Sequence, residues 1–417
     1  MLPPIYYETC TDAVLAVYAR LEDAILSAMV KRILRMGFVS EATKHQAEML
    51  QEAGLLYEDI LQLIAQRTDA CTAQVKALFE DAGVQTVAID NSLHEAAGAL
   101  PIDIRQDSST RQVLEAGYKK TLGTMQNLVS TTATQAQTVF IQTCDRIYMQ
   151  VSSGAFSYQE AIMNALRALA DTGATVSYPT GHTDRMDVAV RRCVLTGVSQ
   201  TAAAVSLRQA EDAGCYLMEI TAHSGARPDH AKWQGQLVSL TGKDVGKTID
   251  GLKVWSLSGI GYGSGEGFKG WNCRHNWHAY YPGLSTPNYT PEELKKLDEP
   301  CISYNGKLYT EYEISQMQRA QERRVRAWKR RCITAQEGVN SATDEATRAT
   351  AQAEFDRSAR YLKNNEAKLK DFCRQTGQDR DRFREQVLGF GRSEAQKAVH
   401  AAKRVQKESK KSVKASQ

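Results

Sequence analysis

The sequence lacks the features of secreted and membrane proteins. Its nine cysteines are odd in number, scattered from Cys10 to Cys373 and never arranged as C-x-x-C, which argues against a disulfide framework and indicates a reducing compartment. No window approaches the ~18 uncharged apolar residues of a transmembrane helix. The opening stretch MLPPIYYETC lacks the basic region and apolar core of a secretory signal. We therefore expect a cytosolic protein, or one that an assembled particle carries elsewhere.

Common catalytic motifs are also missing. Neither H-E-x-x-H nor the phosphate loop G-x-x-x-x-G-K-[ST] occurs in the chain. In the stretch GIGYGSGEGFKG, Glu266 occupies the last glycine position of a G-x-G-x-x-G pattern begun at Gly261, which argues against a dinucleotide site. Ser264 does not lie in a G-x-S-x-G nucleophile elbow, because residue 262 is tyrosine. The sequence therefore supports none of these enzyme classes.

Helical periodicity dominates most of the chain. Apolar residues recur at spacings of three and four, and glycines such as Gly54 and Gly83 stand where a helix would end. Ser157 and Glu160 form a capping box, and the Pro- and Asp-containing stretch 98–110 is a candidate hinge. We predict helices over 11–36, 40–54, 57–83, 118–147, 157–172, 183–214, 314–331 and 355–377.

The pattern changes at Cys215. Residues 215–224 suit a strand, twelve glycines follow between 225 and 283, and Asn305-Gly306 predicts a hairpin turn within 302–313. The predicted fold is mainly α with a smaller irregular α+β module (about 215–313), flanked by long amphipathic helices. The predicted regions are an N-terminal helical region 1–100, a long-helix region 101–214, the Gly/His/Trp-rich module 215–313, C-terminal helices 314–395 and a basic, disordered tail 396–417.

Charge is distributed unevenly along the chain. Residues 1–100 hold 14 acidic and 7 basic side chains, whereas residues 301–417 hold 15 acidic and 26 basic ones, so the net charges are −7 and +11. The basic end is a candidate contact for the phosphates of nucleic acid, although a solvated helix face and a frayed tail explain the same charges. The candidate nucleic-acid-proximal residues are Lys403, Arg404, Lys407, Lys410, Lys411 and Lys414.

Histidine and tryptophan are concentrated in one region. Residues 223–283 hold four of the eight histidines and four of the five tryptophans. Cys273 and His275 lie two apart, so on an extended segment both side chains leave the same face and can bind one ion. His230, with Asp229 as ligand or outer acceptor, completes a tetrahedral set if the first loop folds over the second. This Cys/His mixture favours zinc.

Two other interpretations of this cluster remain open. In one, Cys273 is a buried small side chain, and His230 and His275 hydrogen-bond the backbone of a loop-rich module. Because a single C-x-H spacing is weaker evidence than paired C-x-x-C motifs, we expect this arrangement, with no cofactor. In the other, the cluster is catalytic, with Asp229, His230 and Cys273 as the candidate residues. It then serves either a metal-dependent hydrolase or nuclease, or a nucleophile pair of Cys273 with His230 or His275 as its base.

The arginines and tryptophans of the region have simpler expected roles. Arg227 and Arg274 are expected to bind carboxylates or backbone carbonyls. The four tryptophans are expected in the core of a module with few aliphatic residues. They are Trp233, Trp255, Trp271 and Trp277.

Five stretches of the chain resemble one known family. They are residues 185–202, 222–240, 261–283, 304–326 and 369–398. These stretches are similar to the minor capsid protein 2 family of tailed bacteriophages, which is related to the Mu-type head-morphogenesis proteins, and the likeness runs along nearly the whole chain. The wider group has Arg-x-x-His followed by Asn-Cys-Arg-Cys. The motif positions here are Arg227, Asp229, His230, Gly235, Asn272, Cys273, Arg274 and His275, with histidine in place of the second cysteine.

The resemblance implies a role without a mechanism, because the family has no settled catalytic residues. It implies a minor component of the phage head, present in few copies, that acts near the portal in head morphogenesis and in DNA packaging or delivery. The implied partners are the portal protein, capsid or scaffold proteins, phage DNA through the basic C-terminal region, and other copies of the chain. The implied location is the virion, with the host cytoplasm during assembly. A particle-associated enzyme is the alternative.

Overall fold

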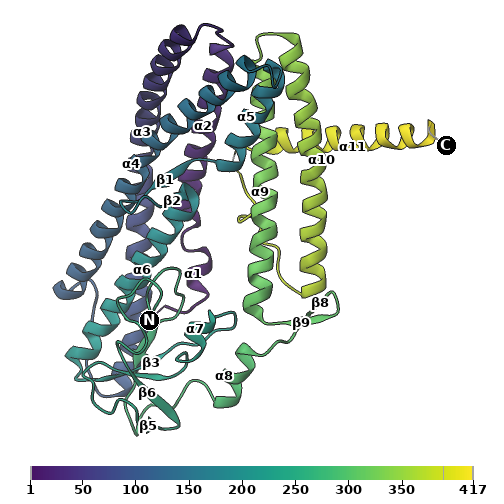
Figure 1. The fold of residues 1–417 in the computed structure, drawn as a ribbon. Coiled ribbons are helices and arrows are strands. Elements are labelled where there is room, and N and C mark those ends of the chain that lie inside the picture. The colour runs from purple at the N-terminus through teal and green to yellow at the C-terminus, as the bar shows by residue number, and fades with distance from the viewer. Residues whose placement is uncertain (1, 388, 416–417) are drawn as a thin grey trace. The chain divides into compact units, whose positions relative to one another are not determined.

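The computed structural model describes residues 2–387 and 389–415, with side chains up to residue 406. Long helices make up most of the chain, as the periodicity predicts (Figure 1). The helices are α1 (Tyr6–Thr9), α2 (Asp12–Met36), α3 (Ala42–Ala96), α4 (Ser108–Ser152), α5 (Tyr158–Thr172), α6 (Met186–Asp212), α7 (Pro228–Ala231), α8 (Pro291–Asp298), α9 (Glu311–Ser341), α10 (Glu345–Thr376) and α11 (Arg392–Ala415).

Short strands form three small sheets. The largest is mixed, with the order β5-β6-β4-β3-β7, and only its β4–β6 pair is parallel. The strands are β1 (Thr175–Ser177), β2 (Thr183–Arg185), β3 (Leu217–Ile220), β4 (Leu237–Ser239), β5 (Thr248–Ile249), β6 (Leu252–Ser256), β7 (Trp277–Ala279), β8 (Ile302–Tyr304) and β9 (Lys307–Tyr309). The mainly α fold with a small α+β module is therefore confirmed.

The chain divides into two compact units, each built from three separate segments. Unit 1 combines the residues through Leu15 with Ala70–Gln126 and Val190–Gln316. Unit 2 combines Ala16–Asp69, Asn127–Ala189 and the residues from Met317 onward. The boundaries fall inside helices such as α3 and α4, so these units do not follow the five consecutive regions that the sequence analysis proposes.

The core of unit 1 lies on both faces of the mixed sheet. On one face, Met218, Val238 and Trp277 pack with Phe268 and with Ala203 of α6. The Trp277 indole N–H donates to the Ala203 carbonyl at 3.1 Å, which joins β7 to α6. The other face carries a second cluster, made of Leu217, Leu237, Leu252, Val254 and Tyr280. Because successive side chains of a strand alternate in direction, these short strands bury apolar residues on both faces.

Helices α4 and α6 pack closely in unit 1. A Cβ added to Gly117 of α4 would lie 2.1 Å from the Thr201 hydroxyl oxygen of α6. A Cβ added to Gly197 of α6 would lie 2.0 Å from the Thr121 hydroxyl oxygen of α4. Each glycine therefore accommodates a threonine of the other helix, which allows the two backbones to approach.

A partly buried ionic network joins the helices of unit 2. Arg185 binds Glu22 of α2 at 2.7 Å and Asp187 of α6 at 3.3 Å. Arg326 of α9 lies 3.7 Å from the other carboxylate oxygen of Asp187. Buried Arg330, also on α9, donates to the carbonyl of Ala170 in α5 at 3.0 Å. Ion pairs and an arginine–carbonyl bond thus connect α2, α5, α6 and α9.

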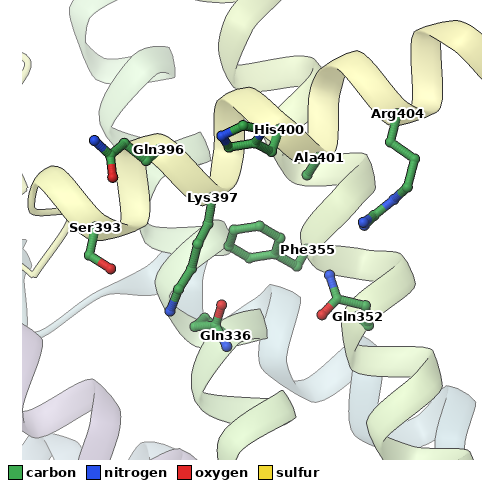
Figure 2. A pocket seen from close by; sticks show the side chains of 9 residues that line it. All are labelled: Gln336, Gln352, Phe355, Ser393, Gln396, Lys397, His400, Ala401 and Arg404. Atoms are coloured by element: carbon green, nitrogen blue, oxygen red, sulfur yellow. The ribbon is translucent and has the colours of Figure 1, made fainter.

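The structure gives the C-terminal segment as helix α11, where the sequence analysis expects a disordered tail from residue 396. In Figure 1, α11 crosses the α9–α10 pair. Ala398 and Ala401 are fully buried and recur at helical spacing, which gives α11 an apolar stripe against α10. A pocket of about 510 Å³ lies at this crossing. Figure 2 shows its lining side chains, with Lys397 extending alongside Phe355 toward Gln336.

The structure corrects two other helix predictions. The predicted helices 40–54 and 57–83 form the single helix α3, which continues through Gly54 and Gly83. Glycine costs a helix interior only ~1 kcal/mol, and packing outweighs this cost. A Cβ on Gly83 would lie 2.6 Å from Leu114 of α4, so this glycine provides close approach and does not end a helix. The helix predicted from residue 183 begins at Met186, because 183–185 form β2.

Several local predictions are confirmed. Helix α2 ends at Met36, and Gly37 follows with a φ of 63°. Ser157 and Glu160 form the predicted capping box. At the β8–β9 turn, Asn305 and Gly306 both have positive φ. The described helices include none with the length and hydrophobicity needed to span a lipid bilayer.

Candidate functional site

The candidate site lies in the loops beside the mixed sheet of unit 1. Pro228 begins the short helix α7, a residue type favoured at a first helical position, and α7 carries His230. The glycine-rich segment then folds tightly on itself: a Cβ on Gly267 would lie 2.0 Å from the Gly261 carbonyl oxygen. This segment leads to Cys273 and His275, just before β7. The sequence therefore needs glycine at these positions to bring Cys273 beside α7.

The structure brings His230, Cys273 and His275 together. The two histidine Nδ1 atoms lie 3.4 Å apart. The Cys273 sulfur lies 3.9 Å from Nδ1 of His230 and 3.7 Å from Nδ1 of His275. All three residues are at most 3% exposed. Among the described residues, these three side chains are the group of potential ligands whose ligand atoms lie close enough together, within 4.8 Å of one another, to hold one metal ion.

The outward nitrogens of both histidines are held by oxygen atoms. Nε2 of His230 lies 2.8 Å from the Glu266 carbonyl oxygen, which also accepts from Arg227 at 2.8 Å. Nε2 of His275 lies 3.3 Å from the side-chain oxygen of buried Gln234. Both rings are thereby oriented with Nδ1 toward the cysteine. The two Nδ1 atoms and the sulfur share one small space.

Burial sets the protonation of the cluster. It lowers the pKa of both His230 and His275, so the imidazoles are neutral at neutral pH. Burial also raises the pKa of Cys273, against the lowering influence of Lys269 and of the backbone N–H groups of Lys269 and His275. A buried thiol with a raised pKa is poorly suited to attack a substrate, which does not favour the nucleophile interpretation.

Asp229 does not join the cluster. It is exposed in α7, while its neighbour His230 is buried, so Asp229 is not part of the group that could hold a metal ion. Gly235 has a φ of 66°, and a Cβ there would lie 2.5 Å from Leu294, which explains glycine at this motif position.

Both arginines act as predicted. Arg227 binds the Glu266 carbonyl, and Arg274 binds the Glu8 carboxylate at 2.6 Å. Directly before Cys273 and Arg274, exposed Asn272 adopts a φ of 55°, a conformation that asparagine tolerates better than most residues. This turn positions Cys273 and Arg274 on opposite sides of the loop, one toward the cluster and the other toward the N-terminal segment.

The prediction that all four tryptophans are core residues is wrong for Trp271. Trp233 and Trp277 are fully buried, and Trp255 packs partly buried against the same core. Trp271 is 52% exposed and covers Gly265, where a Cβ would lie 2.7 Å from the indole ring. Its role is therefore to cover the glycine-rich turn.

Sequence reasoning misses three buried polar residues around the site. Lys269 is 1% exposed, and its Nζ lies 3.2 Å from the Ser199 hydroxyl; burial lowers its pKa to about 7. Asn276 donates to the Leu2 carbonyl at 3.3 Å. On the opposite sheet face, fully buried Glu219 pairs with His278 at 3.3 Å. Nothing in their local sequence indicates burial, because their partners lie far away in the chain.

Comparison with known proteins identifies the family. Residues 2–374 match the family described as phage minor capsid protein 2. The chain belongs to this family. This minor capsid protein is 26% identical to a structural protein of Lactococcus phage LL-H over 301 residues, which cover 70% of the chain and 77% of that relative. It is 37% identical to a structural protein of Lactococcus phage mv4 over 84 residues, 20% of the chain and 59% of that relative. No solved structure matches.

The family match ends before the basic tail of the minor capsid protein. Of the candidate nucleic-acid-proximal residues, Lys403 is exposed, and Arg404 forms an ion pair with Asp356 of α10. The side chains of Lys407, Lys410, Lys411 and Lys414 lie outside the described residues. The structure thus gives Arg404 a role in fixing α11 and leaves Lys403 facing solvent.

Proposed function

We propose that this minor capsid protein is a low-copy component of a tailed-phage head that assembles beside the portal. The observation that carries the proposal is the family match, which extends over residues 2–374 and therefore covers most of both compact units. The Lactococcus phage relatives are named structural proteins, which agrees with an assembly role. The proposed location is the virion, reached by assembly in the host cytoplasm.

Exposed apolar side chains in unit 2 support association with other head proteins. Phe38 follows α2 and stacks on Tyr148 near the end of α4, at a ring distance of 6.1 Å. Met149 is 65% exposed and Phe156 is 41% exposed. Exposed apolar groups of this kind favour burial against a partner. The proposed partners are the portal protein, capsid or scaffold proteins, or another copy of the chain.

The charge distribution supports a position near DNA. The last 117 residues carry a net charge of +11, and the residues from Lys403 onward contribute six of these basic side chains. Basic side chains bind DNA phosphates without sequence preference and release counterions. We therefore extend the proposal to contact between the C-terminal end and the packaged genome.

Cross-linking mass spectrometry of purified procapsids and heads tests the portal assignment. Lysine cross-links from exposed Lys31, Lys44 and Lys76 sample both units, and they should reach the portal protein more often than the major capsid protein. Cross-links to tail proteins alone, or to the major capsid protein without the portal, would contradict it.

A further inference from the structure

The positions of the three buried ligand atoms match a metal coordination sphere. Tetrahedral zinc binds histidine nitrogen at about 2.0–2.1 Å and cysteine sulfur at about 2.3 Å. With tetrahedral angles, these bond lengths separate two nitrogens by about 3.3 Å, and a nitrogen from a sulfur by about 3.6 Å. The observed separations are 3.4 Å between the nitrogens and 3.7 and 3.9 Å from each nitrogen to sulfur. One ion can therefore contact all three atoms.

Metal binding through Nδ1 requires the ring proton of His230 on Nε2, and the surroundings of the ring admit this tautomer. Nε2 lies 2.8 Å from the Glu266 carbonyl oxygen, which can accept that proton, and 2.8 Å from Nη2 of Arg227, which favours the other tautomer. With the proton on Nε2, Nδ1 presents a lone pair to Cys273 and His275. Arg227 donates to the same carbonyl and holds it in place.

The same reasoning applies to His275. The Gln234 side-chain oxygen accepts from the His223 backbone N–H at 3.2 Å, and the Gln234 amide nitrogen donates to Asp298 at 3.4 Å. These two contacts fix the amide so that its oxygen faces His275. Nε2 of His275 is therefore the donor, and Nδ1 carries the lone pair.

With the ring protons of both histidines on Nε2, a hydrogen-bonded core without metal leaves one acceptor unpaired. Two lone pairs then face each other at 3.4 Å, and the single thiol proton of Cys273 can serve only one of them. A cation removes the conflict because it accepts electron density from both nitrogens and from the sulfur. In the other tautomer of His230, which the Arg227 contact favours, Nδ1 donates to His275 and no conflict arises, so metal analysis separates the two arrangements.

We propose that His230, Cys273 and His275 bind one zinc ion through the two Nδ1 atoms and the cysteine sulfur. Two imidazoles and one thiolate form a donor set that suits zinc and excludes the oxygen-preferring magnesium and calcium ions. The hydrogen bonds from Nε2 of His230 to a backbone carbonyl and from Nε2 of His275 to an amide oxygen are the outer contacts that orient metal-binding histidines. The proposal does not depend on the assembly role.

The ion would fasten the glycine-rich segment 257–276 to α7 and to the edge of the sheet. Glycine-rich loops lose much backbone entropy on ordering, so metal binding here is also folding free energy. The same segment carries Lys269, Arg274 and Asn276, which contact Tyr7, Glu8 and Leu2. Loss of zinc should therefore loosen both this segment and the N-terminal residues packed on it.

Metal analysis of the full-length protein, purified without chelator, tests the proposal. We expect about one zinc per chain, and its loss in the Cys273→Ser/His275→Ala double variant. The matched control is Cys215→Ser, because Cys215 is a buried cysteine of the same core whose sulfur faces backbone carbonyls of Leu217 and Tyr280. The control should keep its zinc. Equal zinc content in the control and the double variant would overturn the assignment.

Two further measurements use protein that keeps His230, Cys273 and His275, so they test the proposal even where the double variant fails to fold. Cobalt(II) substitution should give a sulfur-to-cobalt charge-transfer band in the near ultraviolet. In a Cys301→Ser background, which removes the exposed cysteine, a chelator should raise the reactivity of Cys273 with a thiol reagent at least several-fold. Protein that takes up no stoichiometric zinc from added zinc salt, shows no cobalt band and has the same Cys273 reactivity with and without chelator would overturn the proposal.

Discussion

Gly197 of α6 and Thr121 of α4 are in direct contact, and a Cβ at position 197 would lie 2.0 Å from the threonine hydroxyl oxygen. The contact is repeated in reverse between Gly117 of α4 and Thr201 of α6, at 2.1 Å. Two glycines and two threonines therefore set the distance between these helices. Since α6 also supports the mixed sheet through Ala203, this spacing bears on the position of the candidate site.

Gly197→Ala should destabilise the protein. The added methyl group overlaps Thr121, and overpacking of this kind costs about 1–3 kcal/mol even after the gain in helix propensity. Gly123→Ala on α4 is the matched control, because a Cβ there meets nothing within 4 Å, and it should stabilise the helix by roughly 0.5–1 kcal/mol. Denaturant unfolding measures both. Adding Thr121→Ala to Gly197→Ala should restore part of the loss, and equal effects at positions 197 and 123 would refute the close contact.

Asp187→Asn should destabilise the protein more at neutral pH than in acid. Burial alone raises the pKa of Asp187, but Arg185, Arg326 and Arg330 together hold it below its ordinary value. A carboxylate with a lowered folded-state pKa stabilises the fold above pH ~4, and this contribution is lost as the pH falls through the folded-state pKa. We expect a loss of roughly 1–3 kcal/mol at pH ~7, from the charged hydrogen bonds, and a smaller difference at pH ~3. A pH-independent difference would contradict this.

Asp23→Asn should have the opposite effect. Burial raises the pKa of Asp23 to about 6, its Oδ2 accepts from the Gly389 N–H, and its Oδ1 has no partner among the described residues. The folded state then holds the proton more tightly than the unfolded state, so stability falls as the pH rises from ~4 to ~6. The amide avoids this loss and should make the protein about 1–3 kcal/mol more stable than wild type at pH ~7.5, with no gain at pH ~4. A variant less stable than wild type at both pH values would show that Asp23 is not held in this way.

Replacing Lys407, Lys410, Lys411 and Lys414 with glutamine should weaken DNA retention at low salt. The slope of log affinity against log salt is negative, and each lost phosphate contact reduces its magnitude by about 0.9. Loss of all four contacts should therefore make the slope shallower by up to about 4. Lys295→Gln/Lys296→Gln on α8 serves as control, because Glu292 and Glu293 already offset the charge of that helix. Salt titration on a DNA column measures the effect. An unchanged slope would show that these four lysines do not contact DNA phosphates and belong to a solvated helix.

Local signals account for the parts of the fold that the sequence predicts. The glycine at 37, the capping box at Ser157 and the Asn305-Gly306 turn each act within a few residues, so their geometry follows from local chemistry. By contrast, the continuation of α3 through Gly83 depends on Leu114 of another helix. The burial of one face of α11 depends likewise on α10. Packing against another helix decides the course of α3 and the burial of α11, and a local sequence pattern carries no information on that packing.

The candidate site shows the same division. Cys273 and His275 share a recognisable spacing, but His230 lies 43 residues before Cys273 and joins them only because the glycine-rich segment folds back. The burial of Lys269 follows from Tyr7 and Ser199, which come from distant segments. The sequence therefore names the three candidate ligands, and their convergence emerges only from the structure.

Quantitative mass spectrometry of purified procapsids and mature heads tests the central claim, that this chain is a minor structural component of the particle. The account predicts that the protein copurifies with both, at a copy number far below that of the major capsid protein and comparable to that of the portal. Its absence from both particles would contradict the account, as would a copy number equal to that of the major capsid protein.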